Sequence, residues 1–354
     1  MNSTANTMRT WRLHEYGQPV DVLKLETVAI PEPGDGELRV RILGVPLNLN
    51  DLERVTGGNM MVRPEFPYAP GMEVMGVVDK CGAGCEAWQG KRVIAMTAGA
   101  HGGYAEYAIC PPVSAFEIPE SIALPDAAAI YFAYHLAWLG LYERAKVQAG
   151  ETVLIHAAAG SVGSAAIQLA VNAGARVIAT AGSDEKLDWC RTLGAEIAIN
   201  YSSDDFVAAV KEATNGKGVD IVFDNVGEAV MEKSLGAVAY NGRYVMNGFS
   251  SDKTVADEKH LVPRRLALSN INLCTVLLAY ADDAMAEFLK DGMGWNFVPA
   301  ALGEQITAEI TEAVEKGAIK PAIGKVIGFN DIPNALQDLG NRKTIGKIVA
   351  LCES

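Results

Sequence analysis

The stretch TVLIHAAAGSVGSAAIQLAVNAGARVIATAG, from Thr152 to Gly182, decides the fold of this chain. It opens with an apolar strand pattern at Val153 to His156 and closes with another at Arg176 to Ala181. A helical pattern at Ser164 to Asn172 lies between them. A strand, a glycine-containing turn, a helix and a second strand about 20 residues later form the βαβ unit that binds dinucleotides.

The turn of this unit reads Ala157-x-x-Gly160-x-x-Gly163. Glycine at these positions lets the backbone turn tightly, so that a pyrophosphate can approach the N–H groups of the first helical turn, where the helix dipole favours negative charge. We therefore predict that Gly160, Ser161, Val162 and Gly163 bind a dinucleotide. A helix packed closely on a sheet, with no nucleotide, is the alternative that the same small residues allow.

The residues after the second strand indicate which dinucleotide is bound. NAD-binding proteins usually carry an acidic residue there, which accepts hydrogen bonds from the ribose 2′-hydroxyl, but this chain has Gly182 and Ser183. A 2′-phosphate at the start of the following helix would have the Ser183 hydroxyl and the Lys186 ammonium in reach, which favours NADPH. Ser183 also suits a helix N-cap, and the two acids that precede Lys186 temper the preference.

Composition limits the classes of function. A chain of 354 residues is typical of two domains, and 43 acidic against 30 basic residues give a net charge of −13. This charge argues against binding to nucleic acid or to anionic membranes. The first residues contain no apolar signal segment and no run is long enough to span a membrane, so we expect a soluble cytoplasmic protein.

The periodicity of the sequence divides the chain. Short β patterns broken by Pro and Gly predict a mostly β domain before Asp126, and alternating strands and helices after it predict a parallel sheet covered on both faces. Further strands are predicted at Ile197–Ile199, Ile221–Asn225, Tyr244–Asn247 and Asn272–Leu278, and helices at Asp204–Thr214, Glu228–Leu235 and Leu302–Lys316. The β character of Ala322–Phe329 and Lys347–Leu351 suggests that the chain returns to the first domain.

Seven segments together resemble the medium-chain dehydrogenases/reductases, in the quinone oxidoreductase (zeta-crystallin-like) branch. They are Trp11-Arg-Leu-His-Glu-Tyr-Gly17, Leu47-Asn-Leu-Asn-Asp51, Pro70-Gly-Met-Glu-Val-Met-Gly76, Gly102-Gly-Tyr-Ala-Glu-Tyr107, His156 to Gly163, Asp224-Asn-Val-Gly227 and Gly346-Lys-Ile-Val. The resemblance implies an α/β fold: a GroES-like, mostly β domain (1–134 and 319–354) and a Rossmann, doubly wound NADPH domain (135–318) that enclose a cleft. It also implies hydride transfer from NADPH to a quinone or an activated alkene or carbonyl.

The sequence predicts no metal. Zinc-containing members of the family use a Cys near the Asn48 segment and a His in a Gly-His-Glu motif, whereas this chain has no Cys there and reads Gly71-Met72-Glu73. A thioether binds zinc poorly. Cys81 and Cys85 have no second pair or His cluster to complete a site, and the spacing of the six cysteines suggests free thiols.

The resemblance assigns further site residues. Asn48 is the predicted catalytic residue, whose amide would donate a hydrogen bond to the acceptor oxygen as negative charge develops; a turn-forming asparagine is the alternative. Arg342 and Tyr201 are assigned to the 2′-phosphate, and an arginine suits a phosphate through its several N–H donors. The alternatives are a solvated charge at a helix end for Arg342 and a half-buried strand residue for Tyr201. The remaining predicted cofactor contacts are Asn225, Val226, Gly227, Gly248, Phe249 and Leu277.

The substrate pocket is predicted at Asn48, Glu53, Tyr131 and Tyr134. The aromatic run around Tyr134 also fits core packing, and His135 fits either a proton donor or a buried core histidine. The segment from Asp282 to Ala300 is expected to form a lid or a dimer element.

Three functions stay open. The first is a zinc-independent NADPH-dependent quinone or carbonyl reductase; the second is an NADPH-dependent reductase of enone, enal or enoyl thioester double bonds; the third is a cofactor-binding protein with little turnover. The partner is a small-molecule acceptor in the first two. A homodimer is expected through the edge strand Asn272–Leu278.

Overall fold

The computed structural model describes residues 6–58, 62–248 and 263–352. The described chain forms two compact units. Unit 1 comprises residues 1–131, 279–316 and 323–354, and unit 2 comprises residues 132–278 and 317–322. Each unit is built around one large sheet of its own.

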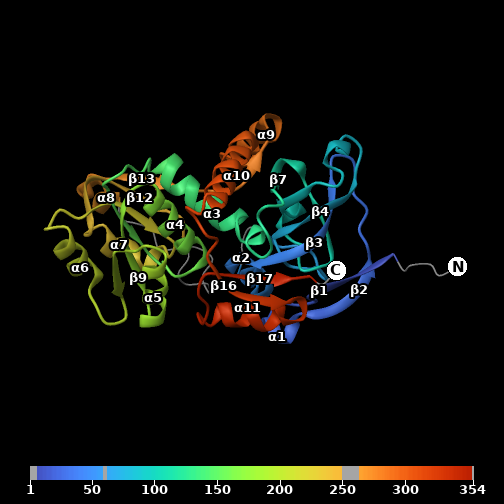
Figure 1. Cartoon of the computed structure of the whole chain (residues 1–354), viewed down its shortest axis with the longest axis horizontal. Coiled ribbons are helices and arrows are strands. Elements are labelled where there is room, and N and C mark those ends of the chain that lie inside the picture. Colours follow the sequence, from blue (N-terminus) through green and yellow to red (C-terminus); the bar gives the residue numbers. More distant parts are fainter. Residues whose placement is uncertain (1–5, 59–61, 249–262, 353–354) are drawn as a thin grey trace. The chain divides into compact units, whose positions relative to one another are not determined.

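Unit 2, which is coloured from green to yellow-orange in Figure 1, contains a six-stranded parallel sheet in the order β10-β9-β8-β11-β12-β13. Counted from β8, the order is 3-2-1-4-5-6, which is the doubly wound arrangement that the sequence predicts. The strands are β8 (Thr152–Ile155), β9 (Arg176–Ala181), β10 (Ile197–Asn200), β11 (Val219–Asp224), β12 (Val238–Met246) and β13 (Asn272–Thr275). The helices are α3 (Tyr131–Trp138), which begins at the last residue of unit 1, α4 (Ser161–Asn172), α5 (Asp184–Thr192), α6 (Phe206–Ala213), α7 (Glu228–Ser234) and α8 (Pro263–Ser269).

The sheet of unit 2 is buried on both faces. Leu154 packs in one cluster with Phe206 of α6 and Met231 of α7. Its neighbours Val153 and Ile155 point to the other face and are also fully buried. A parallel sheet covered in this way needs continuous apolar strands, which is why the strands of unit 2 were visible in the sequence.

Unit 1 is built on a seven-stranded sheet in the order β16-β17-β3-β4-β5-β7, with β6 also paired to β3. Segments from both ends of the chain meet here, because β17 pairs antiparallel with β3. The strands are β3 (Leu38–Leu47), β4 (Glu73–Cys81), β5 (Arg92–Met96), β6 (Tyr107–Cys110), β7 (Ala115–Glu117), β16 (Ile323–Gly328) and β17 (Lys347–Leu351). The hairpin β1 (Thr7–Arg12) and β2 (Lys24–Ala29) and the helices α1 (Pro19–Val22), α2 (Leu49–Thr56) and α11 (Ile332–Gly340) complete this part.

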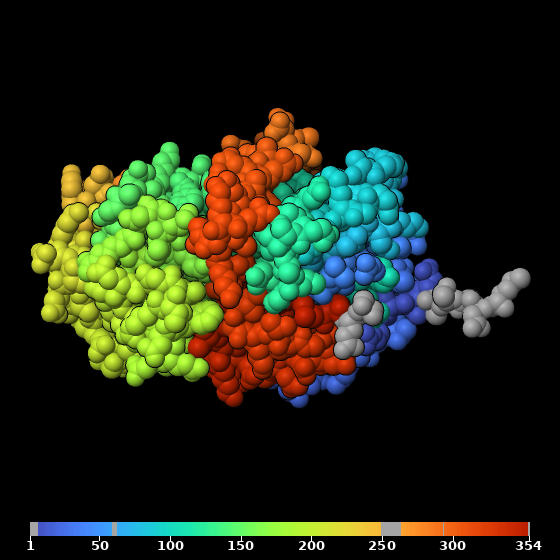
Figure 2. All heavy atoms as spheres, in the orientation of Figure 1, coloured from blue at the N-terminus to red at the C-terminus, as the bar shows by residue number. Residues whose placement is uncertain are grey.

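Residues 279–316 belong to unit 1, whereas the sequence prediction placed them in the Rossmann domain. The segment contains β14 (Tyr280–Ala281), α9 (Asp283–Met293), β15 (Val298–Pro299) and α10 (Ala300–Glu315). The reason is aromatic packing: the Tyr280 ring lies edge-on to Phe116, with centroids 5.1 Å apart. Helix α10 also packs on β7 and the turn before it, and Figure 2 shows its orange-red atoms against the teal atoms of this region.

One predicted strand is shorter than expected. The pattern Asn272–Leu278 predicted seven residues, but β13 ends at Thr275. It nevertheless lies at an edge of the sheet, as the sequence predicted. The segment expected as a lid or dimer element, Asp282 to Ala300, is mainly the helix α9, which begins where the Asp282 side chain accepts a hydrogen bond from the Met285 N–H at 2.8 Å.

Candidate functional site

The glycine turn of unit 2 presents unused donors. Helix α4 begins at Ser161, and its first backbone bond within the helix runs from the Ser164 N–H to the Gly160 carbonyl at 2.8 Å. The N–H groups of the three residues before Ser164 therefore have no acceptor inside the helix. The Ser161 hydroxyl is buried and has no hydrogen-bond partner among the described residues. Donors without partners at a helix start suit an anionic group.

Glycine at position 163 is required by packing. A Cβ there would lie 2.5 Å from the Ala157 carbonyl oxygen and 2.7 Å from the Ala158 Cα, closer than real side chains approach. Any larger residue would push α4 away from the turn. The small residues of the turn are therefore compatible with both explanations given by the sequence. They allow α4 to pack closely on the sheet, and they leave the first N–H groups of α4 uncovered by side chains.

The corner after β9 is open around Ser183. Ser183 occupies the N-cap position of α5, but its side chain makes no capping hydrogen bond. A Cβ at Gly182 would lie 2.6 Å from the Tyr201 hydroxyl oxygen, so glycine allows this ring to approach the backbone. Tyr201 is 51% exposed, and the Ser202 hydroxyl donates to the Gly182 carbonyl at 3.2 Å. Small polar groups therefore surround the place where a 2′-phosphate is predicted.

Hydrogen bonds connect the residues that follow β8 and β11 at the carboxyl edge of the sheet. Asp224 accepts from the N–H groups of Val226 at 2.8 Å and Gly227 at 3.1 Å. The Asn225 amide donates to the His156 carbonyl at 3.0 Å. Burial raises the pKa of Asp224, while the hydrogen bond from Tyr244 acts in the opposite direction.

The chain after β12 packs closely against the same residues after β11. The Gly248 N–H donates to the Asp224 carbonyl at 2.7 Å, and a Cβ on Gly248 would lie 2.2 Å from the Asn225 carbonyl carbon. The Asn247 side-chain oxygen is buried and has no partner among the described residues. Unit 2 thus brings together the predicted contacts at β8, β11 and β12, at the edge where open α/β sheets bind ligands.

The remaining predicted cofactor contacts are Leu277, Phe249 and Arg342. Leu277 follows β13 and is 39% exposed. Phe249 lies outside the described residues. Arg342 belongs to unit 1, in a turn after α11 with φ of 57°.

A buried polar triangle in unit 1 contains the predicted catalytic residue. The Asn48 Nδ2 donates to Glu73 Oε2 at 2.9 Å, and the Lys347 ammonium donates to Asn48 Oδ1 at 2.6 Å. The third side runs from Lys347 Nζ to Glu73 Oε2 at 3.2 Å. All three side chains are at most 5% exposed. Both short bonds of Asn48 go to residues far away in the sequence, so it is not merely a local turn residue.

Asp51 links this triangle to a second buried charge pair. One carboxylate oxygen accepts from the Asn48 N–H at 3.1 Å and the Tyr104 hydroxyl at 3.2 Å. The other accepts from the Met72 N–H at 3.0 Å and lies 3.4 Å from an Arg54 nitrogen. Burial raises the pKa of Asp51, and the Arg54 charge opposes this shift. The predicted pocket and the core of unit 1 therefore share one hydrogen-bonded network.

The residues at the zinc position of related enzymes do not fit a zinc ion. Met72 takes the place of the imidazole ligand, and a lysine ammonium already contacts the Glu73 carboxylate. Within the described residues, no group of three or more His, Cys, Asp or Glu side chains is arranged to hold a metal. Burial raises the pKa of the Cys81 and Cys85 thiols, which disfavours the thiolate that a metal needs.

The aromatic residues at the start of α3 lie in packed surroundings. Tyr131 and Tyr134 are each 1% exposed. The Tyr134 hydroxyl accepts from the Gln168 amide at 3.0 Å and from the Ala322 N–H at 3.2 Å. Burial lowers the pKa of His135 to about 3, so this imidazole is neutral near pH 7. For these residues the structure favours the core-packing alternative over a pocket, whereas Glu53 on α2 is half-buried.

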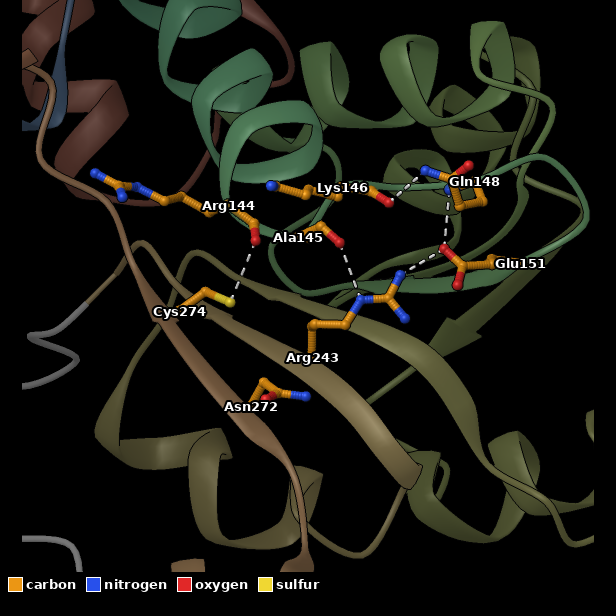
Figure 3. Close-up of a pocket in the computed structure, with 8 residues that line it drawn as sticks. All are labelled: Arg144, Ala145, Lys146, Gln148, Glu151, Arg243, Asn272 and Cys274. Atoms are coloured by element: carbon orange, nitrogen blue, oxygen red, sulfur yellow. Dashed lines mark hydrogen bonds and ion pairs between the residues drawn. The ribbon is translucent and has the colours of Figure 1, made fainter.

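A separate surface pocket of about 540 Å³ lies in unit 2 and contains none of the predicted site residues (Figure 3). Arg243 crosses it and donates to the Ala145 carbonyl at 3.0 Å and to Glu151 at 2.5 Å. Cys274 of β13 contacts the Arg144 carbonyl at 3.6 Å. These bonds tie the end of the π-helix Leu139–Arg144 to the sheet edge, which gives the lining a structural explanation.

Comparison with known proteins assigns the family. A family model described as zinc-binding dehydrogenase matches residues 161–293, and the alcohol dehydrogenase GroES-like domain matches residues 34–120. The rat quinone oxidoreductase-like protein 2 is 33% identical over 338 residues, which cover 95% of this chain and 89% of the relative. The chain belongs to the quinone oxidoreductase branch of the medium-chain dehydrogenases/reductases.

Solved structures agree with this membership. Mycobacterial Rv1454c, solved in complex with NADPH, has a TM-score of 0.82 at 29% identity, covering 97% of this chain and 99% of that one. The CurF ER cyclopropanase from the curacin A biosynthetic pathway has a TM-score of 0.80 at 26% identity, covering 98% and 100%. The GroES-like and Rossmann prediction for the fold is confirmed. The protein is an oxidoreductase of the quinone oxidoreductase family, which uses a nicotinamide cofactor.

The sequence analysis did not identify Lys347 as a neighbour of Asn48. It was visible only as part of the Gly346-Lys-Ile-Val motif, and nothing in the motif indicates that its ammonium lies beside Asn48.

In the part of the chain that the structure describes, no helix is both long enough and apolar enough to cross a membrane.

Proposed function

We propose that this protein transfers a hydride from NADPH to a quinone or another activated carbonyl acceptor without a metal ion. The observation that carries the proposal is the triangle of Asn48, Glu73 and Lys347, in which a buried amide is held between a carboxylate and an ammonium. The residue before Glu73 is Met72, where zinc-containing members of the family have the imidazole ligand. An amide donor stabilises a developing oxyanion, whereas oxidation of a simple alcohol calls for a Lewis acid.

The preference for NADPH is supported by the corner after β9. It has Gly182 and the exposed Ser183 in place of an acidic residue, with Tyr201 beside them and Lys186 one helical turn away. An acid there would repel a 2′-phosphate, and a lysine attracts it. The relative solved with NADPH points in the same direction.

Each set of residues has a separate task. The nicotinamide supplies the hydride when the cofactor is bound. The first turn of α4, with the Ser161 hydroxyl, binds the pyrophosphate. Asn48 orients the acceptor by donating a hydrogen bond to its oxygen, so that charge developing on that oxygen is stabilised.

A binding experiment tests the cofactor proposal. NADPH and NADH are titrated into the wild type and a Lys186→Glu variant, with Lys211→Glu on the exposed side of α6 as a control of equal charge change. We expect Lys186→Glu to weaken NADPH by tenfold or more and NADH by about twofold or less, since a charged hydrogen bond contributes roughly 1.5–3 kcal/mol. Equal losses for both cofactors, or equal losses in the control, would contradict the assignment.

An acceptor screen tests the reaction. Small quinones should consume NADPH in the presence of the enzyme, and zinc analysis of the active protein should find no stoichiometric metal. Cofactor binding without oxidation by any quinone or carbonyl would reject this proposal and leave two alternatives, reduction of a conjugated double bond and a cofactor-binding protein with little turnover.

Reduction of a conjugated double bond is the second candidate, and the similarity to the CurF ER cyclopropanase structure is the observation that favours it. Deuterated NADPH separates the two reactions. Deuterium on the β-carbon of a saturated product indicates alkene reduction, and deuterium on a carbinol carbon indicates carbonyl reduction. Deuterium lost to solvent from a hydroquinone oxygen indicates quinone reduction.

We also propose that two copies pair through β13. This strand is at the edge of the sheet, and Leu273 on it is 43% exposed. An unpaired edge is a template for another strand. Light scattering should find a dimer for the wild type and a monomer for Leu273→Lys; a Leu273→Lys dimer would exclude this edge.

A further inference from the structure

We infer that Lys347 is a positioning residue for Asn48: its ammonium fixes and polarises the amide that receives the acceptor oxygen. The inference rests on the proposed role of Asn48 in hydride transfer. The three side chains come from separate elements of unit 1, since Asn48 precedes α2, Glu73 begins β4 and Lys347 begins β17.

The orientation of the Asn48 amide follows from the chemistry of its neighbours. An ammonium can only donate, so the atom 2.6 Å from Lys347 is the amide oxygen. A carboxylate can only accept, so the atom 2.9 Å from Glu73 is the amide nitrogen. The two partners agree, and turning the amide over would place oxygen against carboxylate and nitrogen against ammonium. Lys347 and Glu73 together therefore hold one orientation.

In this orientation one N–H group of the Asn48 amide stays available to a ligand. The Asn48 nitrogen carries two hydrogens, and Glu73 takes one. The other protein acceptor near the nitrogen is the Pro46 carbonyl at 3.5 Å, which is at the outer limit of hydrogen bonding. One N–H is therefore weakly engaged and can donate to an acceptor oxygen at little cost.

The ammonium also makes this N–H a stronger donor. A cation on the carbonyl oxygen of an amide draws electron density from the nitrogen, so hydrogen bonds on the two ends strengthen each other. All three side chains are buried, where solvent screens such effects weakly. As charge develops on the acceptor oxygen, Lys347 stabilises it through the amide, without touching the substrate.

The variants separate positioning from folding. Lys347→Met removes the ammonium but leaves the Glu73 carboxylate buried without its cation, so this variant is paired with a Lys347→Met/Glu73→Gln double variant, which removes both charges. The glutamine oxygen still accepts from the Asn48 nitrogen. Lys343→Met, an exposed lysine four residues earlier, is the control.

Two readouts are measured on each full-length variant. The first is the side-chain ¹⁵N–¹H signal of Asn48 in asparagine-labelled protein, assigned by its loss in Asn48→Ala. The second is kcat and the KM for NADPH with a small quinone. We expect the Asn48 signal to move in the double variant and kcat to fall about ten- to hundredfold, below the loss from removing an oxyanion donor outright. The KM for NADPH should change by less than about twofold.

The two readouts test the role of Lys347 and the proposed function separately. An unmoved Asn48 signal, or a double variant with wild-type kcat, overturns the role of Lys347. A matched rise of KM and fall of kcat in the Lys343→Met control also overturns it, because any lysine in this segment would then act alike. If the wild type reduces no quinone, the proposed function fails, and the Asn48 signal alone decides whether Lys347 positions the amide.

Discussion

The glycine corner of unit 2, where we propose that the cofactor binds, and the buried triangle of unit 1 hold their polar groups by opposite means. The corner uses backbone N–H groups at the start of α4, and its essential residues, such as Gly163, contribute the absence of a side chain. The triangle uses long charged side chains, Glu73 and Lys347, which contact each other at 3.2 Å. In the corner the Ser161 hydroxyl has no hydrogen-bond partner among the residues that the structure describes, whereas Asn48 has partners at both ends of its amide.

This difference teaches where each region is vulnerable. Backbone donors are held by the helix itself, so the corner should fail when a larger side chain fills the space and should tolerate loss of a hydroxyl. Buried charges are stabilised by each other, so the triangle and its neighbour Asp51 should fail when one partner is removed.

The largest effect is expected at Asp51. Asp51→Ala leaves the Tyr104 hydroxyl and the Arg54 guanidinium without their carboxylate, and we expect a loss of about 3–5 kcal/mol in the free energy of unfolding. Asp51→Asn keeps an acceptor oxygen and should lose roughly half as much. Urea denaturation measures both. Equal losses in the two variants would indicate that the charge, and not the hydrogen bonds, stabilises unit 1.

A somewhat smaller effect is expected from filling the corner. Gly163→Val would place atoms within 2.8 Å of the Ala158 carbonyl oxygen, so α4 must shift, and NADPH binding should weaken by about a hundredfold, or roughly 3 kcal/mol. Gly292→Ala in α9, where a Cβ meets nothing within 4 Å, is the control. Fluorescence titration with NADPH measures the change. Wild-type affinity in Gly163→Val would disprove the pyrophosphate assignment.

A pH-dependent effect is expected at His156, under the corner. Burial lowers its pKa to about 4, and its ring nitrogens contact Thr180 and Ser234 at 2.9 Å. The unfolded imidazole has a pKa near 6.5, so between about pH 6.5 and 4 the unfolded state binds more protons and stability falls as the pH falls. At pH 5 the loss is on the order of 2 kcal/mol. The difference in melting temperature between the wild type and His156→Asn should therefore be smaller at pH 5 than at pH 7. An equal difference at the two pH values would refute this prediction.

The smallest effect is expected at Ser161. Its hydroxyl has no partner among the described residues, so Ser161→Ala should leave the melting temperature unchanged. One hydrogen bond to the cofactor is lost, which should weaken NADPH by about fivefold, or roughly 1 kcal/mol. A drop in stability without a change in affinity would show that the hydroxyl serves the fold and not the ligand.

The success of the sequence prediction depended on how local each feature is. The strand Arg176–Ala181 was predicted with the bounds that the structure has, because a buried parallel strand is a continuous apolar run. The strand Asn272–Leu278 was predicted too long, because apolar residues continue after the pairing with β12 ends. The sequence grouped residues 279–316 with the Rossmann domain, whereas the structure groups them with unit 1, where Tyr280 packs against Phe116, a residue far away in the sequence.

The sequence by itself determined the family, through seven segments that resemble it, and the alternation of strands and helices in unit 2, because apolar periodicity acts over a few residues. The tertiary structure alone decided that Asn48 is held by Glu73 and Lys347, and that Tyr134 is a core residue. The physical reason is sequence separation. Asn48 and Lys347 are 299 residues apart, and they meet only because β17 pairs with β3, so no local pattern could reveal their contact.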